Sequence, residues 1–100
     1  MAVVEVSIVP VGPAGASISR YVAHCLDILD ESGLTYELCP MGTVIEGELP
    51  AILDAIRAMH EGTFGGEVVR VLTTIKVDDR RDKTLSMDGK LAAVRRHREK

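Results

Sequence analysis

The feature that most constrains the fold of this chain is the order of its hydrophobic patterns. Along the first eighty residues, segments with a strand-like period of two alternate with segments of helical spacing. β-Branched segments with a period of two predict strands at residues 2–11, 35–39, 43–46 and 68–77. Between these segments, apolar residues at helical spacing predict one helix that ends near residue 32 and a second helix from residue 49. The apolar stripe of the second helix consists of Leu49, Ile52, Leu53, Ile56 and Met59. The order is therefore strand, helix, strand, strand, helix, strand.

Residues that start and stop helices support this order. Ser17 is a favourable N-cap for the first helix, and Gly33 supplies its C-terminal stop. Ser86 caps a short third helix built on Leu91, Val94 and two alanines. Right-handed crossovers place the two main helices on one face of an antiparallel four-stranded sheet. The sequence predicts one domain over residues 1–100, an α+β ferredoxin-like sandwich with an extra C-terminal helix.

Length limits how stable such a sandwich can be. A chain of 100 residues buries only about 60–65% of its unfolded surface, so oligomerisation would add to its stability. The sequence shows neither a membrane-spanning apolar run nor a signal peptide. Its two cysteines, Cys25 and Cys39, fit a reduced compartment better than a disulfide scaffold. Cys25 lies in the apolar stripe of the first helix and is interpreted as a packing residue. We therefore expect a cytoplasmic protein with no membrane partner.

Charge is unevenly distributed along the chain. Residues 1–68 carry 2 Lys/Arg against 10 Asp/Glu, whereas residues 69–100 carry 10 Lys/Arg against 5 Asp/Glu. The two parts can attract each other within one subunit or between subunits. Nucleic-acid binding is weakly supported, because Tyr21, Tyr36 and Phe64 are the only aromatic residues and cannot build a stacking platform.

The sheet face turned away from the helices needs an explanation. Strand alternation places Glu5, Ser7 and Val9 there, and it assigns Val69, Val71, Ile75 and Val77 to the core. The fourth and second strands would add Arg70, Leu72, Thr74, Lys76, Thr35 and Glu37 to this open face. One interpretation is a solvated face with ion pairs. The other is a subunit interface or a ligand pocket, and the apolar Val9 and Leu72 favour subunit pairing.

Three segments carry a resemblance to known proteins: VEVSIVP at residues 4–10, PMGTVIEGEL at residues 40–49 and RVLTTIKVDDRRDK at residues 70–83. Together they resemble a family of small bacterial and archaeal thiamine-binding proteins. The resemblance covers essentially the whole chain. It implies a ferredoxin-like fold, a homotetramer built as a dimer of dimers, and binding of thiamine or its hydroxymethylpyrimidine moiety. It implies no known reaction.

Seven residues are the candidates for ligand contact: Ser7, Glu37, Thr43, Glu46, Arg70, Thr74 and Lys76. The Glu46 carboxylate could accept a hydrogen bond from the exocyclic amine of an aminopyrimidine. Thr43 and Glu46 point to opposite faces of an ideal strand, so a bulge at Gly42 would be needed for both to reach one ligand. Alternatively, Gly42 and Gly47 are turn residues around a short structural strand.

The remaining polar groups suggest no catalytic centre. The charged run at residues 78–83 is interpreted as a solvated loop or a subunit contact, and the arginines among its aspartates disfavour metal binding. His24, His60 and His97 lack partners at metal-ligand spacing. We expect a non-enzymatic binder in a homo-oligomer that needs no metal or other cofactor. The alternatives are an oligomeric sensor of another small molecule and an enzyme of thiamine metabolism.

Overall fold

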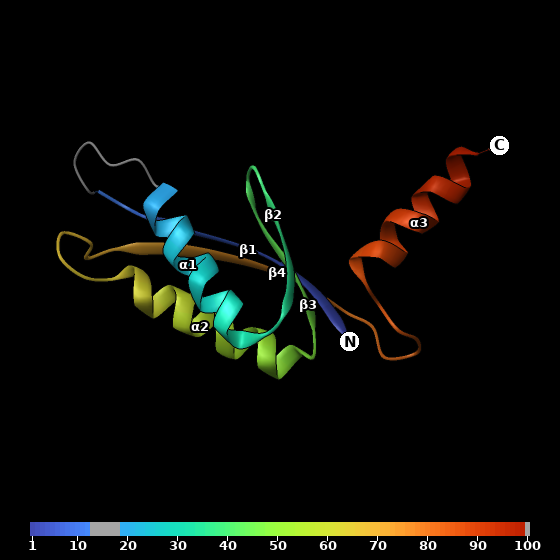
Figure 1. Ribbon diagram of the computed structural model, residues 1–100, viewed down its shortest axis with the longest axis horizontal. Helices are drawn as coiled ribbons and strands as arrows, with labels where there is room; N and C mark the ends of the chain where they lie inside the picture. The colour runs from blue at the N-terminus through green and yellow to red at the C-terminus, as the bar shows by residue number, and fades with distance from the viewer. Residues whose placement is uncertain (13–18, 100) are drawn as a thin grey trace.

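A computed structural model describes residues 1–12 and 19–99 and confirms the predicted order of elements (Figure 1). The elements are β1 (Ala2–Pro10), α1 (Ser19–Ser32), β2 (Thr35–Cys39), β3 (Gly42–Gly47), α2 (Leu49–Thr63), β4 (Val71–Asp79) and α3 (Met87–Arg98). The N-cap predicted at Ser17 lies outside the described residues. Among the helices that are described, none is long and apolar enough to cross a membrane.

The sheet has the strand order β2-β3-β1-β4, and all its pairs are antiparallel. The predicted ferredoxin-like α+β fold is thereby confirmed, with β1 and β4 as neighbours. Helices α1 and α2 lie side by side on one face of this sheet (Figure 1). The core between the layers is centred on five side chains that are at most 2% exposed: Val4, Val6, Leu29, Ile45 and Ile52. Burying each one contributes about 1.5–3 kcal/mol.

Two glycines with positive φ delimit elements of the fold. Gly33 has φ +75° and ends α1, as the sequence predicts. Gly47 has φ +153° and ends β3, where a Cβ atom would lie 3.0 Å from Cδ2 of Leu34. At Gly47 a side chain would therefore meet both backbone strain and a close contact.

The predicted core of the second helix needs one correction. Leu53 was expected in the buried stripe of this helix, but its side chain is 40% exposed. Ala55 is buried in the core cluster together with Ile52, Ile56 and Met59. The helix buries a small residue and exposes a large apolar one, so apolar content alone was a poor guide to this position.

The fourth strand departs further from the prediction. It begins at Val71 because Val68 exchanges two backbone hydrogen bonds with Gly65 in an isolated bridge. Val69, expected in the core, is 83% exposed just before the strand. Ile75 and Val77 share the helix-facing side with core residues of β1, yet they are 43% and 44% exposed. β4 is an edge strand, and the helices cover this side of it incompletely.

Helix α3 stands apart from the sandwich. The predicted cap is confirmed, because the backbone N–H of Gly89 donates to Oγ of Ser86 over 3.0 Å. The helix then points away from the sheet (Figure 1). None of the residues of α3, all of which are described, is buried.

Candidate functional site

Strand register arranges the side chains of the open face in rows across the sheet. One row joins all four strands through Glu37 on β2, Val44 on β3, Glu5 on β1 and Lys76 on β4. With strands about 4.8 Å apart, this row spans about 14 Å. Glu5 and Lys76 are direct cross-strand partners, so opposite charges meet at its β4 end.

The next row holds hydroxyl groups beside a close approach of two strands. Ser7 lies opposite Thr74 on β1 and β4. At Gly42 of β3, a Cβ atom would lie 3.1 Å from the carbonyl oxygen of Val6 and 3.6 Å from Cγ of Glu5. A glycine at this position therefore avoids a tight contact with the backbone of β1. Donors, acceptors and both signs of charge thus surround the middle of the face.

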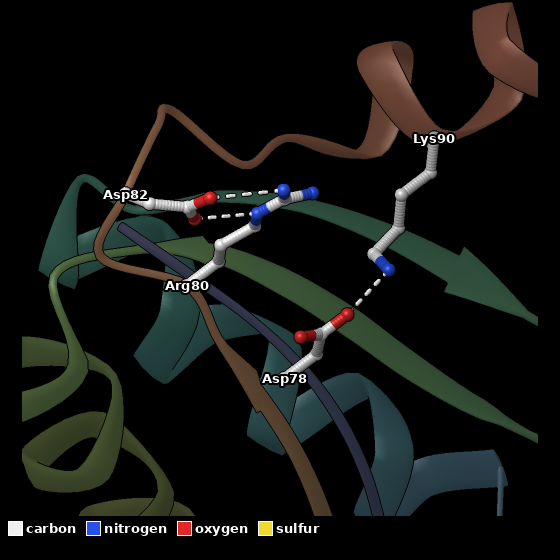
Figure 2. A network of polar contacts seen from close by, with 4 residues as sticks. All are labelled: Asp78, Arg80, Asp82 and Lys90. Carbon is white, nitrogen blue, oxygen red and sulfur yellow. Dashed lines mark hydrogen bonds and ion pairs between the residues drawn. The ribbon is translucent and has the colours of Figure 1, made fainter.

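The row at the far end of the face anchors α3. Val3 lies there between Glu46 on β3 and Asp78 on β4, and it is only 8% exposed. Oε2 of Glu46 accepts a hydrogen bond from the backbone N–H of Met87 over 2.8 Å. Oδ2 of Asp78 accepts one from Nζ of Lys90 over 2.5 Å, as Figure 2 shows. Two acidic side chains therefore hold the start of the last helix.

The structure brings together four of the seven predicted contact residues. Ser7, Glu37, Thr74 and Lys76 all lie on the open face, in the two rows around Gly42. Glu5 belongs with them although it was not among the seven candidates. Its signal in the sequence was its strand alternation with Ser7.

Of the other three candidates, Thr43 and Arg70 lie outside these two rows, and Glu46 is already hydrogen-bonded to α3. Thr43 points into the helix-facing layer and is 6% exposed. The pairing of β2 with β3 runs continuously to Cys39 opposite Gly42, so there is no place for the bulge that Thr43 and Glu46 would need to reach one ligand. Arg70 is exposed just before β4, and its carbonyl accepts from the N–H of Val11 over 2.8 Å. Glu46 shares the open face but is bonded to α3.

A surface hollow lies away from these rows. It has a volume of about 540 Å³ between the start of α2 and the charged loop of residues 79–84, and none of the seven candidates lines it. Arg80 donates two hydrogen bonds to Asp82, over 2.6 and 3.0 Å (Figure 2). This pairing raises the pKa of Arg80 and lowers the pKa of Asp82. Arg81 pairs with Asp79 over 3.0 Å, so the loop largely neutralises its own charges.

The helix layer contains the thiol that the sequence assigned to packing. Cys25 is 6% exposed, which confirms that assignment. Its Sγ lies 3.7 Å from Oγ1 of Thr63, and burial raises the pKa of the thiol. His60 lies nearby, with Nδ1 2.6 Å from Oγ1 of Thr73. Within residues 1–12 and 19–99, no group of three or more His, Cys, Asp or Glu side chains is arranged to hold a metal ion.

Comparison of the sequence with known proteins shows to which family the chain belongs. Residues 4–95 match the family model described as thiamine-binding protein. The chain belongs to the thiamine-binding protein family. The UPF0045 protein YqgV of Bacillus subtilis is 42% identical over 101 residues, which cover 97% of both chains. The UPF0045 protein MJ1052 of Methanocaldococcus jannaschii is 41% identical over 92 residues, which cover 92% of this chain and 90% of that one.

Solved structures of similar proteins agree on the fold. The crystal structure of MJ1052 superposes with a TM-score of 0.85 at 40% identity, covering 93% of this chain and 94% of that one. A Thermotoga maritima protein assigned provisionally to thiamine biosynthesis or salvage superposes with a TM-score of 0.75, covering 93% and 97% of the two chains. At 19% identity, this second likeness shows the fold alone.

Proposed function

We propose that this protein binds thiamine, or its hydroxymethylpyrimidine moiety, on the open face of the sheet. Membership of the thiamine-binding protein family supports the ligand class. The observation that carries the location is the row of Glu37, Glu5 and Lys76, with the hydroxyls of Ser7 and Thr74 in the next row. This site replaces the one centred on Glu46, whose carboxylate already holds α3.

The hydrogen-bonding groups and charges of the proposed ligand complement those of the open face. An aminopyrimidine has an exocyclic amine that donates hydrogen bonds and ring nitrogens that accept them. The carboxylates of Glu5 and Glu37 accept from such an amine, while Lys76 and the hydroxyls of Ser7 and Thr74 donate to the ring. The thiazolium ring of thiamine carries a positive charge, and two carboxylates against one ammonium group give this row a net negative charge.

Binding without chemistry is the role that these groups support best. The exposed carboxylates and hydroxyls can orient a ligand, and the proposed protein is a carrier, buffer or sensor that needs no metal or other cofactor. We place it in the cytoplasm as a homotetramer built as a dimer of dimers, with neither a nucleic acid nor a membrane as its partner. The strongly acidic first part of the chain supports the exclusion of nucleic acid.

Isothermal titration of the full chain with thiamine, thiamine phosphates and hydroxymethylpyrimidine tests this proposal. Glu5→Gln and Glu37→Gln keep the size of each side chain and remove its charge. A charge-assisted hydrogen bond contributes about 1.5–3 kcal/mol, and glutamine keeps an oxygen acceptor, so the expected loss is about 1–2 kcal/mol and each variant should bind about 5–30-fold more weakly. The matched control is Glu31→Gln, at an exposed position of α1 away from the open face.

Two outcomes would overturn the proposal in different ways. If no compound of the series binds, the thiamine function fails for this chain, and a sensor of another small molecule becomes the leading interpretation. If thiamine binds equally to both variants and to the control, the ligand class stands but the open-face site is wrong. Turnover of a bound compound would instead establish an enzyme of thiamine metabolism.

A further inference from the structure

Glu46 lies between the proposed ligand site and the last helix. Its side chain is half-buried on the open face, two residues beyond Val44 of the central row. Two residues along a strand cover about 7 Å. Because Glu5 pairs with Val44, Glu46 is the diagonal neighbour of Glu5 across the pair of β1 and β3. Long side chains on diagonal neighbours can reach each other, so a ligand held at Glu5 comes within reach of Glu46.

The carboxylate of Glu46 uses only part of its hydrogen-bonding capacity. Oε2 accepts from the backbone N–H of Met87 over 2.8 Å, and no other group of residues 1–12 and 19–99 donates to this carboxylate. The two oxygens of an ionised carboxylate together offer about four acceptor positions. Oε1 can therefore accept from a second donor while Oε2 keeps its bond to the helix.

Helix α3 depends on few contacts with the sandwich. None of its residues is buried, and its first residue, Met87, is half-buried. Besides the bond to Glu46, the ion pair between Lys90 and Asp78 holds the start of the helix (Figure 2). A helix of 12 residues is marginal in water without tertiary packing. The docking of α3 is therefore a local equilibrium, which a change at Glu46 can shift.

We infer that Glu46 couples the ligand site to α3, because Oε2 holds the helix while Oε1 accepts from the amine of the aminopyrimidine. A free glutamate side chain samples several rotamers, and a partner at either oxygen has to order it. Once the N–H of Met87 has ordered the carboxylate, the ligand does not have to, so each event favours the other. The inference rests on the proposed function, since it adds Glu46 to the edge of the site around Glu5 and Glu37.

The sharpest test removes the donor of this hydrogen bond and keeps the helix. Proline lacks a backbone N–H but suits the first position of a helix. The preceding Ser86 has φ −146° and ψ 161°, the extended conformation that a residue before proline prefers. Met87→Pro therefore removes the bond to Glu46 while α3 can still begin at residue 87. Met87→Ala, which keeps the N–H, is the matched control.

Isothermal titration and amide hydrogen exchange of the full chain measure the coupling from both sides. Met87→Pro should bind thiamine about tenfold more weakly, the factor expected for ordering one glutamate side chain, and Met87→Ala should bind like the unsubstituted chain. Saturating thiamine should slow exchange of the amides of residues 91–98 by the same factor in the unsubstituted chain, because coupling is reciprocal. In Met87→Pro this slowing should be lost.

Glu46→Gln keeps the inference testable if Met87→Pro loses its helix in circular dichroism. The single oxygen of glutamine has to serve both Met87 and the ligand, so thiamine should no longer slow exchange in α3. Glu48→Gln is the control, because the exposed Glu48 side chain makes no capping hydrogen bond, and this variant should keep the slowing.

The inference is overturned if Met87→Pro binds thiamine with unchanged affinity while α3 is folded. It is also overturned if saturating thiamine leaves exchange in α3 of the unsubstituted chain unchanged. Sedimentation with and without thiamine has to give the same mass, because a ligand-induced increase would attribute the slowing to association and overturn the inference as well. Thiamine binding that weakens in Glu5→Gln without any effect on α3 would refute the coupling alone. If no compound of the series binds, the proposed function fails and the coupling fails with it.

Discussion

The hydrogen bond from Met87 to Glu46 makes a sharp prediction about Glu46→Gln. The carboxylate accepts from a backbone N–H over 2.8 Å at the start of α3. A hydrogen bond to a charged group contributes about 1.5–3 kcal/mol, and a negative charge at a helix N-terminus adds about 0.3–1 kcal/mol. Because glutamine retains an oxygen acceptor, the expected loss is about 1–2 kcal/mol. The local opening of α3 should therefore become about 5–30-fold more frequent.

Amide hydrogen exchange at one fixed protein concentration measures this effect. Amides of residues 91–98 should exchange faster by that factor, while those of Val4 and Val6 in the core should not change, because α3 buries none of its described residues. Glu48→Gln is the matched control, since the Glu48 side chain makes no capping hydrogen bond at the start of α2. Equal acceleration in α3 and in β1, or none in α3, would refute the assignment of Glu46 as the anchor of this helix.

Four other perturbations test the fold and the open face. Leu29→Ala removes a fully buried side chain and should lower the free energy of unfolding in urea by about 2–5 kcal/mol. Gly47→Ala introduces strain at φ +153° and should lower it by about 1–3 kcal/mol, whereas an unchanged urea midpoint would contradict this view of the turn. Burial raises the pKa of Cys25 above its ordinary value of 9.0, so the unfolded chain ionises first and stability should fall as pH rises above about 9. Cys25→Ala should flatten that fall in pH-dependent melting. Lys76→Ala should leave the circular dichroism spectrum unchanged and weaken binding or assembly; unfolding would show that β4 has the opposite facing.

Most of the fold was predictable because local patterns and topology agree. Strand alternation placed Glu5, Ser7 and Lys76 on one face correctly, because successive side chains of a strand point to opposite faces even in a twisted sheet. Gly33 marked a helix end through its positive φ, and Ser86 marked one through the hydrogen bond that its side chain accepts. These signals depend on residues close in sequence, and tertiary packing did not override them.

The errors arose where distant residues decide the outcome. The Gly65–Val68 bridge displaced the start of β4, and the sequence contains no local signal for such a pairing. Glu46 was interpreted as a ligand residue because its carboxylate could accept from an aminopyrimidine, and that role stays a prediction. The sequence has no signal for its bond to Met87, which joins residues 41 positions apart. A bulge at Gly42 would have been needed for Thr43 and Glu46 to reach one ligand, and the continuous pairing of β2 with β3 leaves no place for it.

The position of β1 in the sheet has a consequence for how the protein is made. Within this sheet β1 is synthesised before its partners β3 and β4, and Ala2 finally pairs with Asp79. Until residues 71–79 have been synthesised, one edge of β1 exposes unpaired backbone groups beside Val4 and Val6. Pairing over such sequence separations is slow, so nascent and truncated chains should aggregate more readily than the finished one.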